Sequence, residues 1–185
     1  MRRPQGGRQE RVTGMRPYPV DRVDARSSPT LRAWLQNVYL LYLYELTAFN
    51  PGGYRLSPEG RWEPDYLPYW LSPLYCYPLA IRRGETSVGF ALVGVGAFPF
   101  KSPGCDVRMS EFFVLRPYRR CGVGRAGALA AFGGFHGIRE VTELRENILA
   151  IAFWRTVIRE FTGGQYLDES VGALQRQVFE SRGSP

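Results

Sequence analysis

The sequence predicts one α/β domain built around a mixed β-sheet, and three observations support this prediction. The chain has 185 residues, 44% of them hydrophobic, which suffices for one sizeable core. Strand-like runs and helical patterns alternate through its second half. One helical pattern follows a strand across a tight turn and leads into a further strand, so these two strands are expected to run parallel.

The first half of the chain is expected to form one long helix and an aromatic loop. Ser28-Pro29-Thr30 precedes apolar residues at helical spacing over residues 31–46, and the pattern ends before Asn50-Pro51-Gly52-Gly53. Residues 54–78 contain five prolines among tyrosines and tryptophans, which leaves room only for a short helix near residues 65–71. We interpret these aromatic residues as core and lid packing in preference to direct substrate contact.

The second half is expected to supply most of the sheet. Residues 79–81 and 87–93 are strand-like and flank the turn Arg83-Gly84-Glu85, which indicates an antiparallel hairpin. The further expected elements are a strand at 109–115, a helix at 124–135, a strand at 138–144, a helix at 148–160, and a closing pair of strands at 166–167 and 174–179.

The positive charge is concentrated at the start of the chain. The formal net charge is +7, and five arginines against Glu10 give +4 within the first sixteen residues. This stretch is rich in Gly, Arg and Pro, so residues 1–15 are expected to be a disordered tail and residues 16–185 the domain. We prefer a solvated tail to a nucleic-acid-binding arm, and we expect no specific nucleic acid partner.

Composition also argues against membranes and metals. There is no run of eighteen apolar residues and no apolar segment behind the basic start, so we expect neither a membrane-spanning helix nor a secretory signal. We therefore expect the protein to be cytoplasmic. Three scattered cysteines and a single histidine lack the spacing of a zinc site. We therefore expect reduced thiols and no metal.

The turn Arg119-Arg120-Cys121-Gly122-Val123-Gly124 has the features of a phosphate site. It lies between a strand ending at Leu115 and a helix opening near Gly122. The first N–H groups of a helix have no partner within the helix, and the helix dipole is positive there. The two glycines let the backbone approach a diphosphate, and the two arginines add charged donors.

A dinucleotide site uses a similar pattern. Gly122-Val123-Gly124-Arg125-Ala126-Gly127 satisfies G-x-G-x-x-G, and Glu140 or Glu143 lies about 20 residues on, where a ribose-binding acid would fall. However, a dinucleotide-binding Rossmann unit usually opens its domain, with the glycines directly after the strand. Too little chain also follows here to complete a doubly wound sheet. A glycine-rich helix start without any ligand is the other alternative.

Two motifs in order resemble those of the GCN5-related N-acetyltransferase (GNAT) superfamily. Its cofactor signature [Q/R]-x-x-G-x-[G/A] is matched by Arg119-Arg120-Cys121-Gly122-Val123-Gly124. Its second signature, N-x-x-A-x-x-F-[Y/W], is matched by Asn147-Ile148-Leu149-Ala150-Ile151-Ala152-Phe153-Trp154. The resemblance spans about residues 86–168, and residues 111–120 resemble a bacterial branch of predicted acetyltransferases.

The resemblance implies a GNAT domain with helices on both faces of a mostly antiparallel sheet, which is splayed between its fourth and fifth strands. In this chain, the strand 109–115 would part from the strand 138–144, and the pantetheine arm of acetyl-CoA would lie in the gap. The residues expected to bind this co-substrate are Phe113, Val114, Leu115, Arg119, Arg120, Cys121, Gly122, Val123, Gly124, Arg125, Ala126, Asn147 and Phe153.

Acyl transfer needs a neutral amine, a polarised carbonyl and a proton for the departing thiolate. The N–H of Val114 or Leu115 would serve the developing oxyanion. Glu111 on the same strand could take the amine proton directly or through water, or it could be a solvated or ion-paired carboxylate. Trp154 replaces the tyrosine often found after the motif phenylalanine, so Tyr118, Tyr166 or water remains to supply the proton.

The resemblance therefore implies an acetyl-CoA-dependent N-acetyltransferase that uses direct attack in a ternary complex. Its acceptor would be the amine of a small molecule or peptide, and a homodimer follows from the habit of the superfamily alone. A non-catalytic CoA-binding or sensing module is the first alternative. A nicotinamide-dinucleotide-binding protein is the second.

Overall fold

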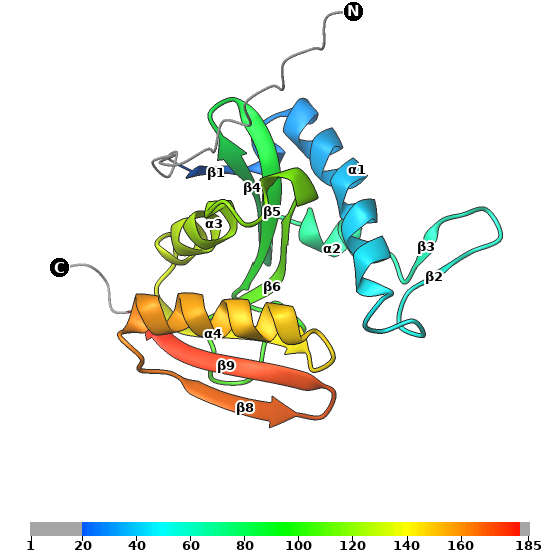
Figure 1. Ribbon diagram of the computed structural model, residues 1–185. Coiled ribbons are helices and arrows are strands. Elements are labelled where there is room, and N and C mark those ends of the chain that lie inside the picture. Colours follow the sequence, from blue (N-terminus) through cyan, green and yellow to red (C-terminus); the bar gives the residue numbers. More distant parts are fainter. Residues whose placement is uncertain (1–19, 182–185) are drawn as a thin grey trace, which may run out of the picture.

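The computed structural model describes residues 20–181, and the predicted tail lies outside them (Figure 1). Within the described part, seven strands form one sheet in the order β1-β4-β5-β6-β7-β9-β8. Neighbouring strands are antiparallel except β6 and β7, which are parallel. The strands are β1 (Val20–Asp24), β4 (Cys76–Arg83), β5 (Thr86–Val95), β6 (Val107–Val114), β7 (Gly137–Leu144), β8 (Leu167–Val171) and β9 (Leu174–Ser181). The predicted mixed, mostly antiparallel sheet is confirmed.

Helices cover both faces of this sheet, as expected. The helices are α1 (Pro29–Leu46), α2 (Leu67–Trp70), α3 (Val123–Phe132) and α4 (Ile148–Thr162), with short 3-10 turns at Ala25–Ser27 and Arg116–Tyr118. Helices α3 and α4 pack on one face and share a core with β6, β7 and β9. Helices α1 and α2 pack on the other face, on the opposite side of β5 and β6 (Figure 1).

Local sequence accounts for the ends of the long helices. Helix α1 begins where the Ser28 side chain accepts a hydrogen bond from the Leu31 N–H at 3.1 Å, directly before Pro29. Helix α4 begins at Asn147, whose Oδ1 accepts from the Ala150 N–H at 3.1 Å. It ends at Gly163, which has a left-handed backbone with φ of 65°.

The structure adds three strands that the sequence did not predict. Strand β1 is an edge strand that pairs with β4, and β2 (Arg55–Leu56) and β3 (Trp62–Glu63) form a small separate hairpin inside the aromatic stretch. Strand β4 also begins earlier than predicted and includes Pro78. Proline is tolerated there because β1 stops pairing at Leu79, so no partner needs a hydrogen bond from residue 78 on that side.

The aromatic stretch packs mainly into the core between α1 and the sheet, as expected from the sequence. Trp70 is buried, and its indole N–H donates to the Tyr39 hydroxyl of α1 at 3.2 Å. Trp62, Tyr66 and Tyr75 pack against the same cluster. This stretch therefore fixes the position of α1 over the sheet.

The sheet opens between β6 and β7, its fourth and fifth strands in spatial order. The two strands pair only over residues 107–109 of β6 and 139–141 of β7, and the last matched pair is Met109 with Val141. Strand β6 contains a bulge at this point, because Leu92 of β5 faces Glu111 while Val93 faces Met109, which leaves Ser110 without a partner. The expected gap between these strands is confirmed.

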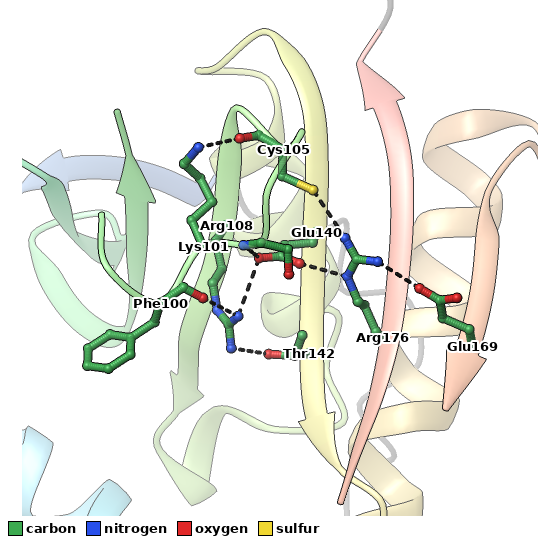
Figure 2. A network of polar contacts seen from close by, with 9 residues as sticks. Phe100, Lys101, Cys105, Arg108, Glu140, Thr142, Glu169 and Arg176 are labelled. Carbon is green, nitrogen blue, oxygen red and sulfur yellow. Dashed lines mark hydrogen bonds and ion pairs between the residues drawn. The ribbon is translucent and has the colours of Figure 1, made fainter. Parts of the chain in front are cut away.

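A buried ionic network holds the closed end of this gap (Figure 2). Glu140 of β7 is fully buried and lies between Arg108 of β6, at 3.3 Å, and Arg176 of β9, at 2.8 Å. Arg108 also donates to Thr142 Oγ1 at 2.6 Å. Burial acts to raise the pKa of Glu140, but hydrogen bonds from Ser102 and Arg176 hold that pKa below its usual value. The three strands are therefore joined by charged contacts where the splay begins.

Candidate functional site

A cavity of about 200 Å³ lies where β6 and β7 part. Both diverging strands and the helices on both faces of the sheet contribute to its wall. The wall includes Tyr42 of α1, Ser110 and Glu111 of β6, Glu143 of β7, Asn147 at the N-cap of α4, and Trp154 of α4. A molecule in this cavity would therefore touch elements from both layers of helices.

Glu111 and Tyr42 form one hydrogen-bonded unit in this cavity. The Tyr42 hydroxyl donates to Glu111 Oε2. Burial raises the pKa of Glu111 to about 7, against the lowering effects of that hydrogen bond and of the Arg108 charge. Burial and the Glu111 charge raise the pKa of Tyr42 well above its usual value, so the tyrosine stays protonated. Near neutral pH, Glu111 is therefore poised between its two protonation states.

The backbone of β6 directs only some of its groups into the gap. The Leu115 N–H donates to the Val88 carbonyl at 2.9 Å, so it points toward β5. In an antiparallel pair the hydrogen-bonding direction alternates along the strand, so Phe113 also bonds to β5 while Phe112 and Val114 face the gap. Of the two amides expected to serve an oxyanion, only that of Val114 can do so. Phe113 and Leu115 can line the gap without offering it a backbone donor.

The turn before α3 presents free amide groups. Gly122, at the helix N-cap, has φ of 85°, and no side chain caps the helix. The first intrahelical bond runs from the Ala126 N–H to the Gly122 carbonyl, at 3.0 Å. The N–H groups of Val123, Gly124 and Arg125 consequently have no partner among the described residues. Ala126, which was expected to contribute an amide, does not.

The arginines around this turn differ in their availability. Arg119 donates to the Val114 carbonyl at 2.6 Å and to Glu45 of α1 at 2.9 Å, so it braces the turn against α1. Arg125 pairs with Glu160 on the surface. Arg120 is exposed and has no ion pair within residues 20–181. Arg120 is therefore the arginine of the turn that is free to meet an anion.

The second motif forms the opposite wall. Asn147 uses its Oδ1 to cap α4, which leaves its side-chain NH₂ available beside the cavity. Phe153 stacks on Phe112 with ring centroids 5.8 Å apart. A Cβ at Gly124 would lie 3.4 Å from the Phe153 ring, at ordinary van der Waals distance, so α3 and α4 pack together at this point. Cys121 is exposed, and its thiol donates to the Tyr118 carbonyl at 3.0 Å.

Comparison with known proteins identifies this arrangement. No family model and no curated protein matches the chain. A solved structure assigned to the GNAT acetyltransferase family, from Desulfovibrio desulfuricans, shares 14% identity at a TM-score of 0.51, covering 88% of this chain and 98% of its own. A second solved structure, assigned as an acyl-CoA N-acyltransferase from Klebsiella pneumoniae, shares 15% identity at a TM-score of 0.52. The match covers 90% of this chain and 99% of that one. The chain has the GNAT fold.

The two tyrosines expected as acids lie away from the cavity of this GNAT fold. Tyr118 packs against a small cluster that contains Ile81 and Val88. Tyr166 packs against the core beneath α4. Neither contributes to the cavity wall among the described residues. Trp154, by contrast, lies in both the wall and the core, with its ring 5.1 Å from that of Phe112, which confirms its packing role.

The structure brings Glu143 into the site, and sequence reasoning considered this residue only as part of a dinucleotide pattern. Its side chain is buried, and burial raises its pKa to about 8. The Gln177 amide donates to Glu143 Oε1 across 2.8 Å when its nitrogen faces that carboxyl. Tyr42, Tyr54 and Ser110 are further wall residues that no sequence motif indicated.

Within residues 20–181, no helix is long and apolar enough to cross a membrane. The described side chains also include no group of three histidine, cysteine, aspartate or glutamate residues arranged to hold a metal ion.

Proposed function

We propose that this protein is an acetyl-CoA-dependent N-acetyltransferase that moves an acetyl group to an amine by direct attack in a ternary complex. One observation carries the proposal. The free amides at the start of α3 follow the end of β6 in the chain, and the open edge of β6 borders a cavity that contains a carboxyl group with a pKa near neutrality. The protein would thus offer a phosphate-binding turn, an open strand edge for an extended ligand arm, and a base for an amine.

The residues present suit coenzyme A. The amides of Val123, Gly124 and Arg125 with the Arg120 side chain would hold the diphosphate, because free helix N-terminal amides and a cation favour anions. The Asn147 NH₂ would bind the pantetheine arm. When bound, acetyl-CoA supplies an acyl group activated as a thioester.

Glu111 would take the proton that the acceptor amine loses. Its pKa of about 7 leaves part of the population ionised at neutral pH, and this ionised carboxylate can accept a proton. The Tyr42 hydroxyl orients that carboxylate through its hydrogen bond. The Val114 N–H would donate to the carbonyl oxygen of the acyl group as negative charge develops there.

The acceptor would approach from the side of α1. Tyr42, Leu46 and Tyr54 form that part of the cavity wall. They surround Glu111 with aromatic and apolar surface, which suits an amine attached to an apolar or aromatic body. A small molecule or a peptide terminus would meet this requirement.

The proposal is tested by titrating the protein with acetyl-CoA and CoA while following its thermal stability, and by measuring thiol release over a panel of amines. We expect stabilisation by both ligands and thiol release with at least one amine. Glu111→Gln should bind CoA equally well and release thiol at least about a hundredfold more slowly. Absence of any stabilisation would refute the coenzyme A site.

Two other results would replace this function with an alternative. CoA binding without thiol release across the panel would indicate a sensing module. A change in NADH fluorescence on adding the protein would indicate a dinucleotide site. The buried pairing of Glu140 with Arg108 and Arg176 counts against a dinucleotide site that uses Glu140, because the Glu140 carboxylate is already engaged.

A further inference from the structure

Two carboxyl groups occupy equivalent places at the mouth of the gap. The last matched pair of β6 and β7 is Met109 with Val141. Glu111 and Glu143 each lie two residues beyond that pair, and both line the cavity. The strands diverge at this point, so the two side chains stand on either side of the space between them.

The bulge at Ser110 places these carboxyls on opposite faces of the sheet. Met109 and Val141 both pack in the core beneath α3 and α4. In a regular strand a side chain two residues on returns to the same face, so Glu143 stays on the α4 side with Gln177. The extra residue in β6 reverses the alternation, so Glu111 faces α1 and accepts from Tyr42.

The surroundings of the two carboxyls differ accordingly. Glu143 is faced by Gln177 of β9, Asp168 of β8 and Arg155 of α4. Burial raises its pKa most, Asp168 raises it further, and Gln177 and Arg155 lower it, which leaves the pKa at about 8. Glu111 is faced by Tyr42 and Arg108, which both favour its ionised form. At neutral pH, Glu143 thus carries a proton that it can give up.

We propose that Glu143 is the general acid that protonates the departing sulfur, acting across the gap from Glu111. This inference rests on the proposed acetyltransferase activity. The amine nitrogen forms a bond to the thioester carbonyl carbon, and the carbon–sulfur bond breaks. Glu111 takes the proton lost by nitrogen, and Glu143 gives its proton to sulfur. Solvent then returns a proton to Glu143 and removes one from Glu111.

The positions of the two groups fit this division of roles. Glu143 shares the cavity wall with Asn147, the N-cap of α4, and with Trp154 of α4, and α3 packs on the same face of the sheet as α4. The thiol and its diphosphate would lie on that face. Glu111 lies on the α1 face, from which the amine would come. The base Glu111 therefore lies on the side where the amine nitrogen loses a proton, and the acid Glu143 lies on the side where sulfur gains one.

The test compares wild type with Glu143→Gln and with a matched control, Glu146→Gln. Glu146 is exposed and lies only three residues further along the chain. kcat, the KM for acetyl-CoA and CoA-induced thermal stabilisation are measured from pH 6 to 9.5 with an amine that supports thiol release. For wild type we expect kcat to fall on the alkaline side as Glu143 loses its proton, near pH 8.

For Glu143→Gln we expect kcat to be at least about tenfold lower, an unchanged KM for acetyl-CoA, and no alkaline fall. Glu146→Gln should match wild type. Glu143→Asp keeps a carboxylic acid and should retain the alkaline fall in kcat. This variant also keeps the test possible if Glu143→Gln does not fold. A Glu143→Gln enzyme with wild-type kcat, or one that keeps the alkaline fall, would overturn the assignment. A wild-type protein that binds CoA but never releases thiol would instead overturn the proposed function itself.

Discussion

Replacing Glu143 by glutamine is expected to stabilise the fold in alkaline solution and to change it little in acid. In the folded protein the pKa of this carboxyl is raised to about 8, whereas an unfolded chain has the ordinary value of 4.5. Between these values the folded state binds the proton more tightly than the unfolded state does. Stability must therefore fall as pH rises from 4.5 to 8, and this loss requires the carboxyl.

The size of the effect follows from the two pKa values. A tenfold difference in proton affinity corresponds to about 1.4 kcal/mol, so the interval from 4.5 to about 8 corresponds to at most about 5 kcal/mol. The side chain is only 7% exposed, so little solvent screening reduces this value. In a chain of this length, each kcal/mol changes the melting temperature by roughly 2–4 °C. The variant should then melt above wild type at pH 9 by up to about 10–20 °C.

Urea and thermal unfolding of wild type, Glu143→Gln and Glu146→Gln from pH 4.5 to 9 measure this effect without any ligand. The first variant should diverge from wild type progressively above pH 5, while the second should remain parallel to it. Loss or gain of the bond to Gln177 adds an offset that does not depend on pH. A difference between Glu143→Gln and wild type that stays constant over the whole range would show that Glu143 is not a carboxyl of raised pKa.

Three further substitutions have defined outcomes. Tyr42→Phe removes a hydrogen bond that lowers the pKa of Glu111, so the acid limb of kcat/KM should shift to higher pH by about one unit. Gly127→Ala places a Cβ 2.9 Å from Ile81 Cδ1 and should lower the free energy of unfolding in urea by about 1–3 kcal/mol. Ser28→Ala removes the N-cap of α1 and should lower that free energy by about 1 kcal/mol.

Each of these substitutions has a control on the same element. Tyr44→Phe removes an exposed hydroxyl from α1 and should leave the pH profile unchanged. Gly133→Ala follows the end of α3, where the nearest atom to a new Cβ is 3.6 Å away, so it should be tolerated. Thr30→Ala lies beside the cap without providing it. Equal effects of a substitution and its control would contradict the contact assigned to it.

Local sequence rules were sufficient for elements whose signals lie within the element. Helix α1 has its cap and apolar spacing together, the β4–β5 hairpin has its turn, and α3 follows its glycines. The edge strand β1 was missed because Val20–Asp24 has only five residues, two of them apolar, and no regular alternation of exposed and partly buried positions. Its strand conformation depends on pairing with β4, more than fifty residues away in the chain.

The candidate site could be predicted only in part for a similar reason. Glycines and amides at the turn are local features, and they were found. The pairing of Tyr42 with Glu111 joins residues 69 positions apart, and the helical spacing that contains Tyr42 indicates only a packed face. Arg119 matched a cofactor motif, but in the structure it contacts Glu45 and the Val114 carbonyl. A motif shows which residues occur together, whereas their partners depend on the assembled fold.

The bulge at Ser110 links the shape of the gap to its chemistry. One extra residue in β6 marks where pairing with β7 stops, and it also turns Glu111 toward α1 while Glu143 remains on the α4 side. Without the bulge, both carboxyls would face α4, and their charges would compete for one environment. The buried pairing of Arg108 with Glu140 closes the gap just before this point. Separation of the two strands and separation of two proton-transfer roles therefore have the same structural origin.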